Sequence, residues 1–302
     1  MLKRMQSSPF PGTIRSWLVL VCLLPFASVA VHAQSSAVTL TPAVVVAGSP
    51  QLIHVQATGA TSIDGVWLGR KLQFFRSHGN HGWFALAGVD VEAPEGPSTL
   101  TITLHRAKGG VRDLSQTVEI HPMNYETTSL TVEPKFVEPD PEALKQIEAE
   151  RQLKEQIFAA SASKPLWLAR FRAPVAGPRS EPFGTRRTFN GKLASIHKGM
   201  DFRIRTGTPV RASNSGVVVL ARPLYYEGNC VVIDHGLGFF TISMHLSKIA
   251  VKEGQHVAKG QRLGLSGATG RVTGPHLHWA VRWQGAYLDP AKLLRLNLNS
   301  IR

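Results

Sequence analysis

Two series of short, β-rich runs restrict the fold of this 302-residue chain more than any other feature of its sequence. The first series extends over residues 37–121 and the second over residues 208–283, and clusters of Gly, Pro and Ser separate the runs. β-Branched and aromatic residues favour strands, whereas closely spaced Gly and Pro end them. The sequence therefore predicts an all-β protein built from two groups of short strands.

The first series has the spacing of a small antiparallel sandwich. Its apolar or β-branched runs lie at residues 43–46, 51–55, 98–104 and 116–120. Short runs at intervals set by turn residues are typical of immunoglobulin-like folds. We expect an immunoglobulin-like β domain at residues 34–122.

Proline and acidic residues interrupt the β pattern beyond residue 122. Residues 132–141 contain three prolines, and proline cannot donate to the hydrogen-bond ladder of a sheet. Residues 142–160 are rich in Glu, Lys, Gln, Leu and Ala and contain neither Gly nor Pro, so they favour a helix. We expect residues 123–163 to form a linker with a helix.

The last run of the second series, residues 276–283, places two histidines on one side of a strand. Side chains alternate along a strand, so Leu277 and the residues at every second position after it form an apolar face. His276 and His278 point to the other side, about 6.6 Å apart at a rise of 3.3 Å per residue. One of them can therefore bind a metal ion while the other reaches a group held by that ion.

His197 and Asp201 offer the ligands that this strand lacks. Asp201 opens an alternating run, residues 201–205, and His197 precedes it in a loop. Two imidazoles and one carboxylate can bind a tetrahedral zinc ion and leave its fourth position open for the water that hydrolysis requires. His245, at the end of another apolar run, is a further candidate site residue. Alone it carries little information, and it becomes a candidate because the other histidines and Asp201 are also present.

These elements together resemble the lysostaphin and LytM family of zinc endopeptidases, which cleave cross-link or stem peptides of bacterial peptidoglycan. The similarity covers about residues 173–294 and includes residues 270–279, whose sequence is Gly-Arg-Val-Thr-Gly-Pro-His-Leu-His-Trp. An acidic residue often follows this segment in the family, whereas Ala280 is found here. The resemblance implies a β-rich, LytM-type zinc peptidase domain with an open groove at residues 164–302.

The resemblance also implies roles for five residues. One zinc ion per chain is expected to bind to His197, Asp201 and His278. The expected catalytic histidines are His245 and His276, and the sequence leaves open which of them is the general base. No other cofactor is expected.

Two functions are compatible with these residues. The first is that of a zinc metalloendopeptidase that hydrolyses peptide cross-links or stem peptides of peptidoglycan through a zinc-activated water. The alternative is a non-hydrolytic or autoinhibited regulator of the cell envelope, which binds peptidoglycan or activates another wall hydrolase. This alternative requires a blocked cleft, because the chain retains every expected ligand.

The first 33 residues predict export. Three basic residues precede an apolar stretch that is shorter than the roughly 20 residues of a membrane span, and Ala33 closes a small-residue cleavage site. We expect a cleavable signal peptide at residues 1–33, a secreted or periplasmic protein, and no stable membrane span after cleavage. Cys230 is then the only cysteine of the mature chain, and its apolar neighbours favour a buried thiol.

Charge is divided sharply along the chain, which carries 34 Lys+Arg and 20 Asp+Glu. Residues 165–302 contain 20 Lys+Arg and 6 Asp+Glu, a charge of +14, whereas residues 34–164 contain 11 and 14, a charge of −3. A positive field attracts polyanions, which for an exported protein means anionic envelope polymers. No recognition-helix pattern is present, so we expect no nucleic-acid partner. The sequence leaves the oligomeric state open.

Overall fold

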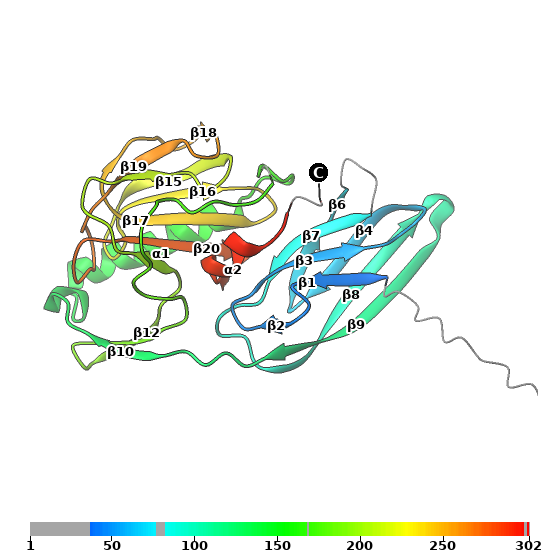
Figure 1. Ribbon diagram of the computed structural model, residues 1–302, viewed down its shortest axis with the longest axis horizontal. Coiled ribbons are helices and arrows are strands. Elements are labelled where there is room, and N and C mark those ends of the chain that lie inside the picture. The colour runs from blue at the N-terminus through cyan, green and yellow to red at the C-terminus, as the bar shows by residue number, and fades with distance from the viewer. Residues whose placement is uncertain (1–36, 77–81, 168, 299–300, 302) are drawn as a thin grey trace, which may run out of the picture. The chain divides into compact units, whose positions relative to one another are not determined.

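Strands make up most of the ordered structure (Figure 1). The computed structural model describes residues 37–76, 82–167, 169–298 and 301, so the signal peptide expected at residues 1–33 lies outside the described residues. The described part of the chain has two α-helices, α1 (Pro141–Ala159) and α2 (Pro290–Arg295). Neither helix combines the length and the apolar character that crossing a bilayer requires. A mostly β architecture is therefore confirmed.

The N-terminal region forms two sheets. One has four strands in the order β1 (Val38–Thr41), β3 (Pro50–Val55), β7 (Trp83–Gly88) and β6 (Phe75–Arg76). The other has five in the order β2 (Val45–Val46), β9 (Val111–His121), β8 (Gly96–Arg106), β4 (Ala60–Trp67) and β5 (Arg70–Gln73). Within β8, Leu100, Ile102 and Leu104 are buried, as the period of two predicts for a strand with one face on a core.

A third, small sheet lies between the two large groups of strands in the sequence. Its strand β10 (Thr127–Leu130) pairs in parallel with β11 (Arg186–Phe189), which pairs antiparallel with β12 (Leu193–Ile196). The stretch that holds β10 lies in the predicted linker, where no strand is expected from the sequence. Its β-branched residues form one because the fold brings the distant strand β11 alongside as a partner.

Helix α1 begins and ends close to the predicted bounds. The Asp140 carboxylate accepts a hydrogen bond from the Ala143 N–H at 2.8 Å, and Pro141 occupies the first helical position, so the start is capped in two ways. Leu153, Ile157 and Phe158 pack against an apolar cluster of the largest sheet. The helix thus covers one face of that sheet.

The largest sheet has nine strands and carries most of the C-terminal region. Its main path is β13 (Met200–Phe202), β20 (Leu277–Trp283), β17 (Phe239–Ile249), β16 (Gly228–Asp234), β15 (Gly216–Leu224) and β18 (His256–Val257). Strands β14 (Pro209–Arg211), β19 (Arg262–Ser266) and β21 (Ala286–Leu288) pair onto this path.

Apolar side chains cover both faces of this sheet. The face predicted for the last strand is confirmed, because four residues of β20 are at most 1 % exposed and belong to one core cluster: Leu277, Trp279, Val281 and Trp283. Ala280 and Cys230 belong to a second cluster, where the Phe158 ring of α1 contacts the Phe240 ring at 5.1 Å. Burial raises the pKa of the Cys230 thiol well above its usual value, as expected for an inert core cysteine. Apolar packing therefore fixes this sheet from both sides.

Candidate metal centre

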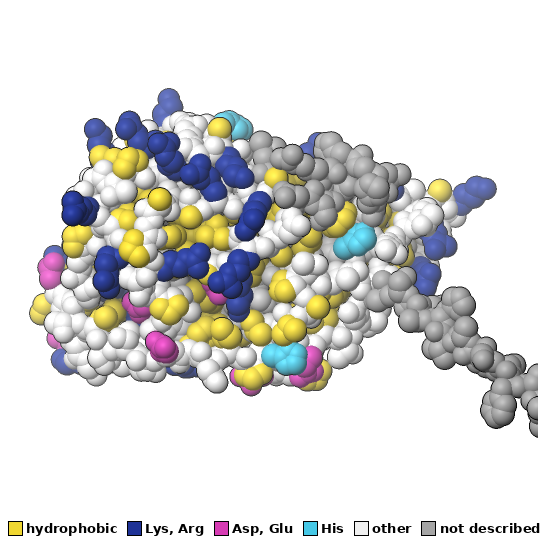
Figure 2. Space-filling model, viewed as in Figure 1, with side chains coloured by type: hydrophobic (Ala, Val, Ile, Leu, Met, Phe, Trp, Pro, Cys, Tyr) yellow, Lys and Arg dark blue, Asp and Glu magenta, His cyan; other side chains and the backbone are white. Residues whose placement is uncertain are grey.

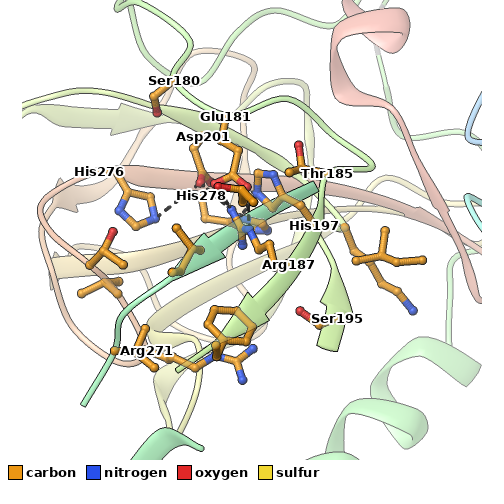
Figure 3. Close-up of a pocket in the computed structure, with 18 of the residues that line it drawn as sticks. Ser180, Glu181, Thr185, Arg187, Ser195, His197, Asp201, Arg271, His276 and His278 are labelled. Carbon is orange, nitrogen blue, oxygen red and sulfur yellow. Dashed lines mark hydrogen bonds and ion pairs between the residues drawn. The ribbon is translucent and has the colours of Figure 1, made fainter. Parts of the chain in front are cut away.

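Pairing of two strands brings the first two candidate ligands together. Strands β13 and β20 are antiparallel, and Asp201 lies directly opposite His278 in their register. Side chains of directly paired residues lie on the same face of a sheet. Figure 3 shows both side chains in one pocket, and His278 Nδ1 lies 2.9 Å from Asp201 Oδ1.

A fixed tautomer makes His197 the third candidate ligand. His197 lies just before β13, its side chain is fully buried, and its Nδ1–H donates to the Pro182 carbonyl at 2.7 Å. Because the proton of a neutral imidazole is then on Nδ1, the lone pair is on Nε2. This Nε2 lies 3.1 Å from Asp201 Oδ1 and 3.0 Å from His278 Nδ1.

The three donor atoms suit one metal ion. They belong to His197, Asp201 and His278, all three residues are buried, and their ligand atoms lie within 4.8 Å of one another. Tetrahedral zinc with bonds of about 2.0–2.1 Å holds its ligand atoms roughly 3.3 Å apart, close to the 2.9 to 3.1 Å between these donors. This match in spacing means that the donor set fits a divalent metal.

Protonation states in the cluster match what a metal requires. Burial raises the pKa of the Asp201 carboxyl, but the close contacts of its oxygens with the His197 and His278 rings outweigh burial and hold the pKa well below its usual range. Burial lowers the pKa of His278 to about 4. The carboxylate is therefore ionised and this imidazole is neutral at pH 7, the forms that bind metals.

Arg187 on β11 holds the second oxygen of Asp201. It donates to Asp201 Oδ2 at 3.0 Å and to both carboxylate oxygens of Glu181, at 2.7 and 2.5 Å. With Oδ2 engaged in this way, Oδ1 is the oxygen that faces the two histidines. Arg187 could not be identified from the sequence, because only the tertiary fold brings this residue of β11 to Asp201.

A β-bulge turns His245 into the same pocket. Across the bulge, Asn229 of β16 pairs with Leu246 and Val231 pairs with Ser243, so β17 has an extra residue between these pairs. His245 has a φ of +62°, which is rare for a residue other than glycine. As a result both Met244 and His245 line the pocket, although consecutive residues of a regular strand face opposite sides.

His245 and His276 lie beside the three candidate ligands, and each ring is held by a hydrogen bond from Nδ1 to a backbone carbonyl. His245 Nδ1–H donates to the Thr269 carbonyl at 2.8 Å, and His276 Nδ1–H donates to the Gly274 carbonyl at 2.8 Å. Their ring centroids are 4.9 Å apart, and His276 Nε2 lies 3.9 Å from Asp201 Oδ2. Burial, with smaller contributions from His276 and His278, lowers the pKa of His245 to about 3, so this imidazole is neutral at pH 7.

All five residues that the sequence analysis selected line one groove of about 1200 Å³. His276 lies one residue before β20 rather than within it and forms an isolated bridge with Gly267. His276 and His278 nevertheless line the same groove, as the alternation predicts. Figure 2 shows Lys and Arg side chains gathered over the nine-stranded sheet on the viewed face.

Comparison with known proteins places this groove in a family. Residues 195–290, which contain all five residues, match the model of peptidase family M23. A solved structure described as a putative peptidase M23 from Pseudomonas aeruginosa is 31% identical, with a TM-score of 0.65, and the likeness covers 82% of this chain and 94% of that one. The chain belongs to peptidase family M23. For most of its length, this M23 protein therefore shares both fold and sequence with a solved relative.

Curated relatives match about a third of the chain. Peptidoglycan DD-endopeptidase ShyA of Vibrio cholerae is 52% identical over 101 residues, which are 33% of this chain and 24% of that protein. Peptidoglycan DD-endopeptidase ShyB of the same organism is 45% identical over 96 residues, which are 32% of this chain and 22% of that protein. The matched part of the chain thus spans about a quarter of the length of these relatives.

Proposed function

We propose that this protein is an exported zinc metalloendopeptidase that hydrolyses peptide cross-links or stem peptides of bacterial peptidoglycan. The observation that supports the proposal most strongly is the convergence of His197 Nε2, Asp201 Oδ1 and His278 Nδ1 on one point of an open groove. The names of the M23 relatives, peptidoglycan DD-endopeptidases, support the substrate class. The regulator alternative is not favoured, because every residue that hydrolysis needs is present in the groove.

In the proposed mechanism the cluster of His197, Asp201 and His278 holds one zinc ion. Bound there, zinc supplies a Lewis acid that polarises a carbonyl and lowers the pKa of a water molecule to about 7. Arg187 keeps the Asp201 carboxylate oriented through Oδ2. Two imidazoles and one carboxylate are a ligand set that catalytic zinc sites use.

The two remaining histidines move protons in this proposal. His245 is neutral and its Nδ1 proton is committed to Thr269, so its Nε2 lone pair can accept the proton of the attacking water. His276, with 17 % of its side chain exposed, is the more accessible of the pair. In its protonated form it can donate from Nε2 to the developing oxyanion or to the departing amine.

The proposal includes the domain organisation. A signal peptide at residues 1–33 directs the chain to the cell envelope, and an immunoglobulin-like domain follows at residues 34–122. A linker with a helix at residues 123–163 leads to the peptidase domain at residues 164–302. The arrangement of strands into two N-terminal sheets supports the second of these segments.

Release of peptides from purified sacculi tests the proposed function. We expect the zinc-loaded protein to release soluble fragments and His278→Ala to lose both the zinc and the activity, with the far-UV spectrum of a β protein unchanged. His256→Ala is the matched control, because His256 is exposed and does not line the groove. Undiminished release by His278→Ala would contradict the proposal.

A further inference from the structure

Arg271 lines the same groove and is held by two aromatic rings. Its Cζ lies 4.5 Å from the centroid of the Phe189 ring and 4.5 Å from that of the Tyr226 ring. The backbone N–H of Arg271 donates to the Tyr226 carbonyl at 2.9 Å, which fixes the residue at its base as well. Figure 3 shows the Arg271 side chain in the pocket that also holds His276 and His278. The guanidinium is therefore positioned rather than free to rotate in solvent.

The charge of Arg271 has no partner among the described residues. Within the part of the chain that the structure describes, its guanidinium makes ring contacts only, with no acceptor for any of its five N–H donors. Arg187 in the same groove differs, because Glu181 and Asp201 already neutralise it. Glu227, which lies near enough to affect Arg271 electrostatically, pairs through Oε1 with Lys154 at 2.5 Å, and its Oε2 makes no hydrogen bond to Arg271 or to any other described residue.

A half-buried cation without a partner is an unusual arrangement. Burial is the main cause that lowers the pKa of Arg271 from its usual value, so the surroundings disfavour the isolated charge. Two other arginines of the groove, Arg186 and Arg203, are exposed, and water can solvate them. Such a cation gains most from an anion that displaces the remaining water and meets the planar fork of the guanidinium.

We propose that Arg271 is a specificity residue that binds a carboxylate of the substrate peptide. This inference rests on the proposed function, because it assigns part of the same groove to the same substrate. A carboxylate is planar and accepts two parallel N–H bonds from one guanidinium, and the stem peptides of peptidoglycan carry free carboxylates. The rings of Phe189 and Tyr226 hold the guanidinium in position, so little conformational freedom is lost on binding.

Single replacement of carboxylates in the substrate tests this assignment. The substrates are cross-linked peptide dimers in which one carboxylate at a time is converted to a carboxamide. For the wild type we expect one of these amidations to lower kcat/KM by roughly 10- to 100-fold, the loss of one charge-assisted pair. Arg271→Met should cleave that amidated dimer as fast as the wild type does. It should cleave the parent dimer, which has the free carboxylate, no faster than the amidated one.

Two further variants sharpen the comparison. Arg271→Lys keeps the charge without the planar fork, so we expect it to retain only part of the discrimination. Arg186→Met removes an exposed arginine of the same groove and should retain the full discrimination.

The other possible results refute either the carboxylate assignment or the proposed function. Wild-type protein that cleaves every amidated dimer as fast as the parent refutes the carboxylate assignment and leaves the proposed function standing. Equal loss of activity by Arg271→Met on all dimers also refutes the assignment, since it shows a structural role alone. Wild-type protein that cleaves no dimer and no sacculus refutes the proposed function itself.

Discussion

Replacing Gly199 with alanine tests how tightly the His278 imidazole is positioned. A Cβ at residue 199 would lie 2.4 Å from His278 Nε2, 2.5 Å from His278 Cε1 and 2.9 Å from the Trp279 carbonyl oxygen. The backbone of Gly199 is not in the left-handed region, so alanine is compatible with its conformation. The substitution therefore acts through the contact with the ring rather than through backbone strain.

The size of the effect follows from the geometry. Ordinary contacts begin at 3.4 Å, so the ring must move by about 1 Å to accommodate the methyl group, whereas ligand distances in metal sites tolerate about 0.2 Å. Overpacking of this kind costs about 1–3 kcal/mol. If this cost falls on the metal-bound state, the Kd for zinc rises roughly 5- to 150-fold.

Titration of the metal-free protein with zinc, in competition with a chromophoric chelator, measures this change. Gly110→Ala is the control, because its Cβ would meet only the Arg106 Cβ at 3.6 Å and its backbone is likewise outside the left-handed region. Thermal unfolding in the presence of a chelator should show that both variants fold. An unchanged zinc affinity in Gly199→Ala would refute the reasoning that the ring has no room to move.

Two other predictions concern histidines. His276→Ala should retain its zinc and lose turnover, because in the proposed mechanism His276 is not a ligand. Atomic spectroscopy measures the zinc content, and peptide release measures turnover. Zinc loss equal to that of His278→Ala would contradict this prediction. Burial lowers the pKa of His235 to about 4. Between pH 6.5 and pH 4, this imidazole is therefore protonated in the unfolded state and neutral in the folded state. The free energy of unfolding should therefore fall as the pH drops from 6.5 to 4, by up to about 3 kcal/mol from this group. Urea unfolding of the wild type and of His235→Gln at pH 5 and pH 7 measures how the free energy of unfolding changes with pH. If that change is the same in both proteins, protonation of His235 is not its cause.

The elements that could be predicted from the sequence are those with a local pattern. Strict alternation in β20 predicted the buried face of Leu277 and its partners, and it also predicted that His276 and His278 share a side. Helix α1 could be predicted from the composition of residues 142–160, which contain neither Gly nor Pro. These features depend on neighbouring residues in the chain, so a single sequence is enough to find them.

The features that escaped prediction depend on contacts between distant segments. Alternation alone sends Met244 and His245 to opposite faces, and only the bulge opposite β16 turns His245 into the groove. Arg187 and Arg271 carry no local signal that distinguishes them from the other basic residues of this cationic region. Arg187 contacts Asp201, which lies 14 residues further along the chain, and Arg271 packs against aromatic rings of two other segments.

The pairing of Asp201 with His278 has a consequence for how the protein matures. These residues are 77 positions apart, and they meet only when β13 and β20 align correctly. A shift of one position between the strands would send one of the two donors to the opposite side of the sheet. A copy with the wrong register would therefore lack the candidate metal cluster, and the proposed activity would arise only together with the correct pairing of these strands.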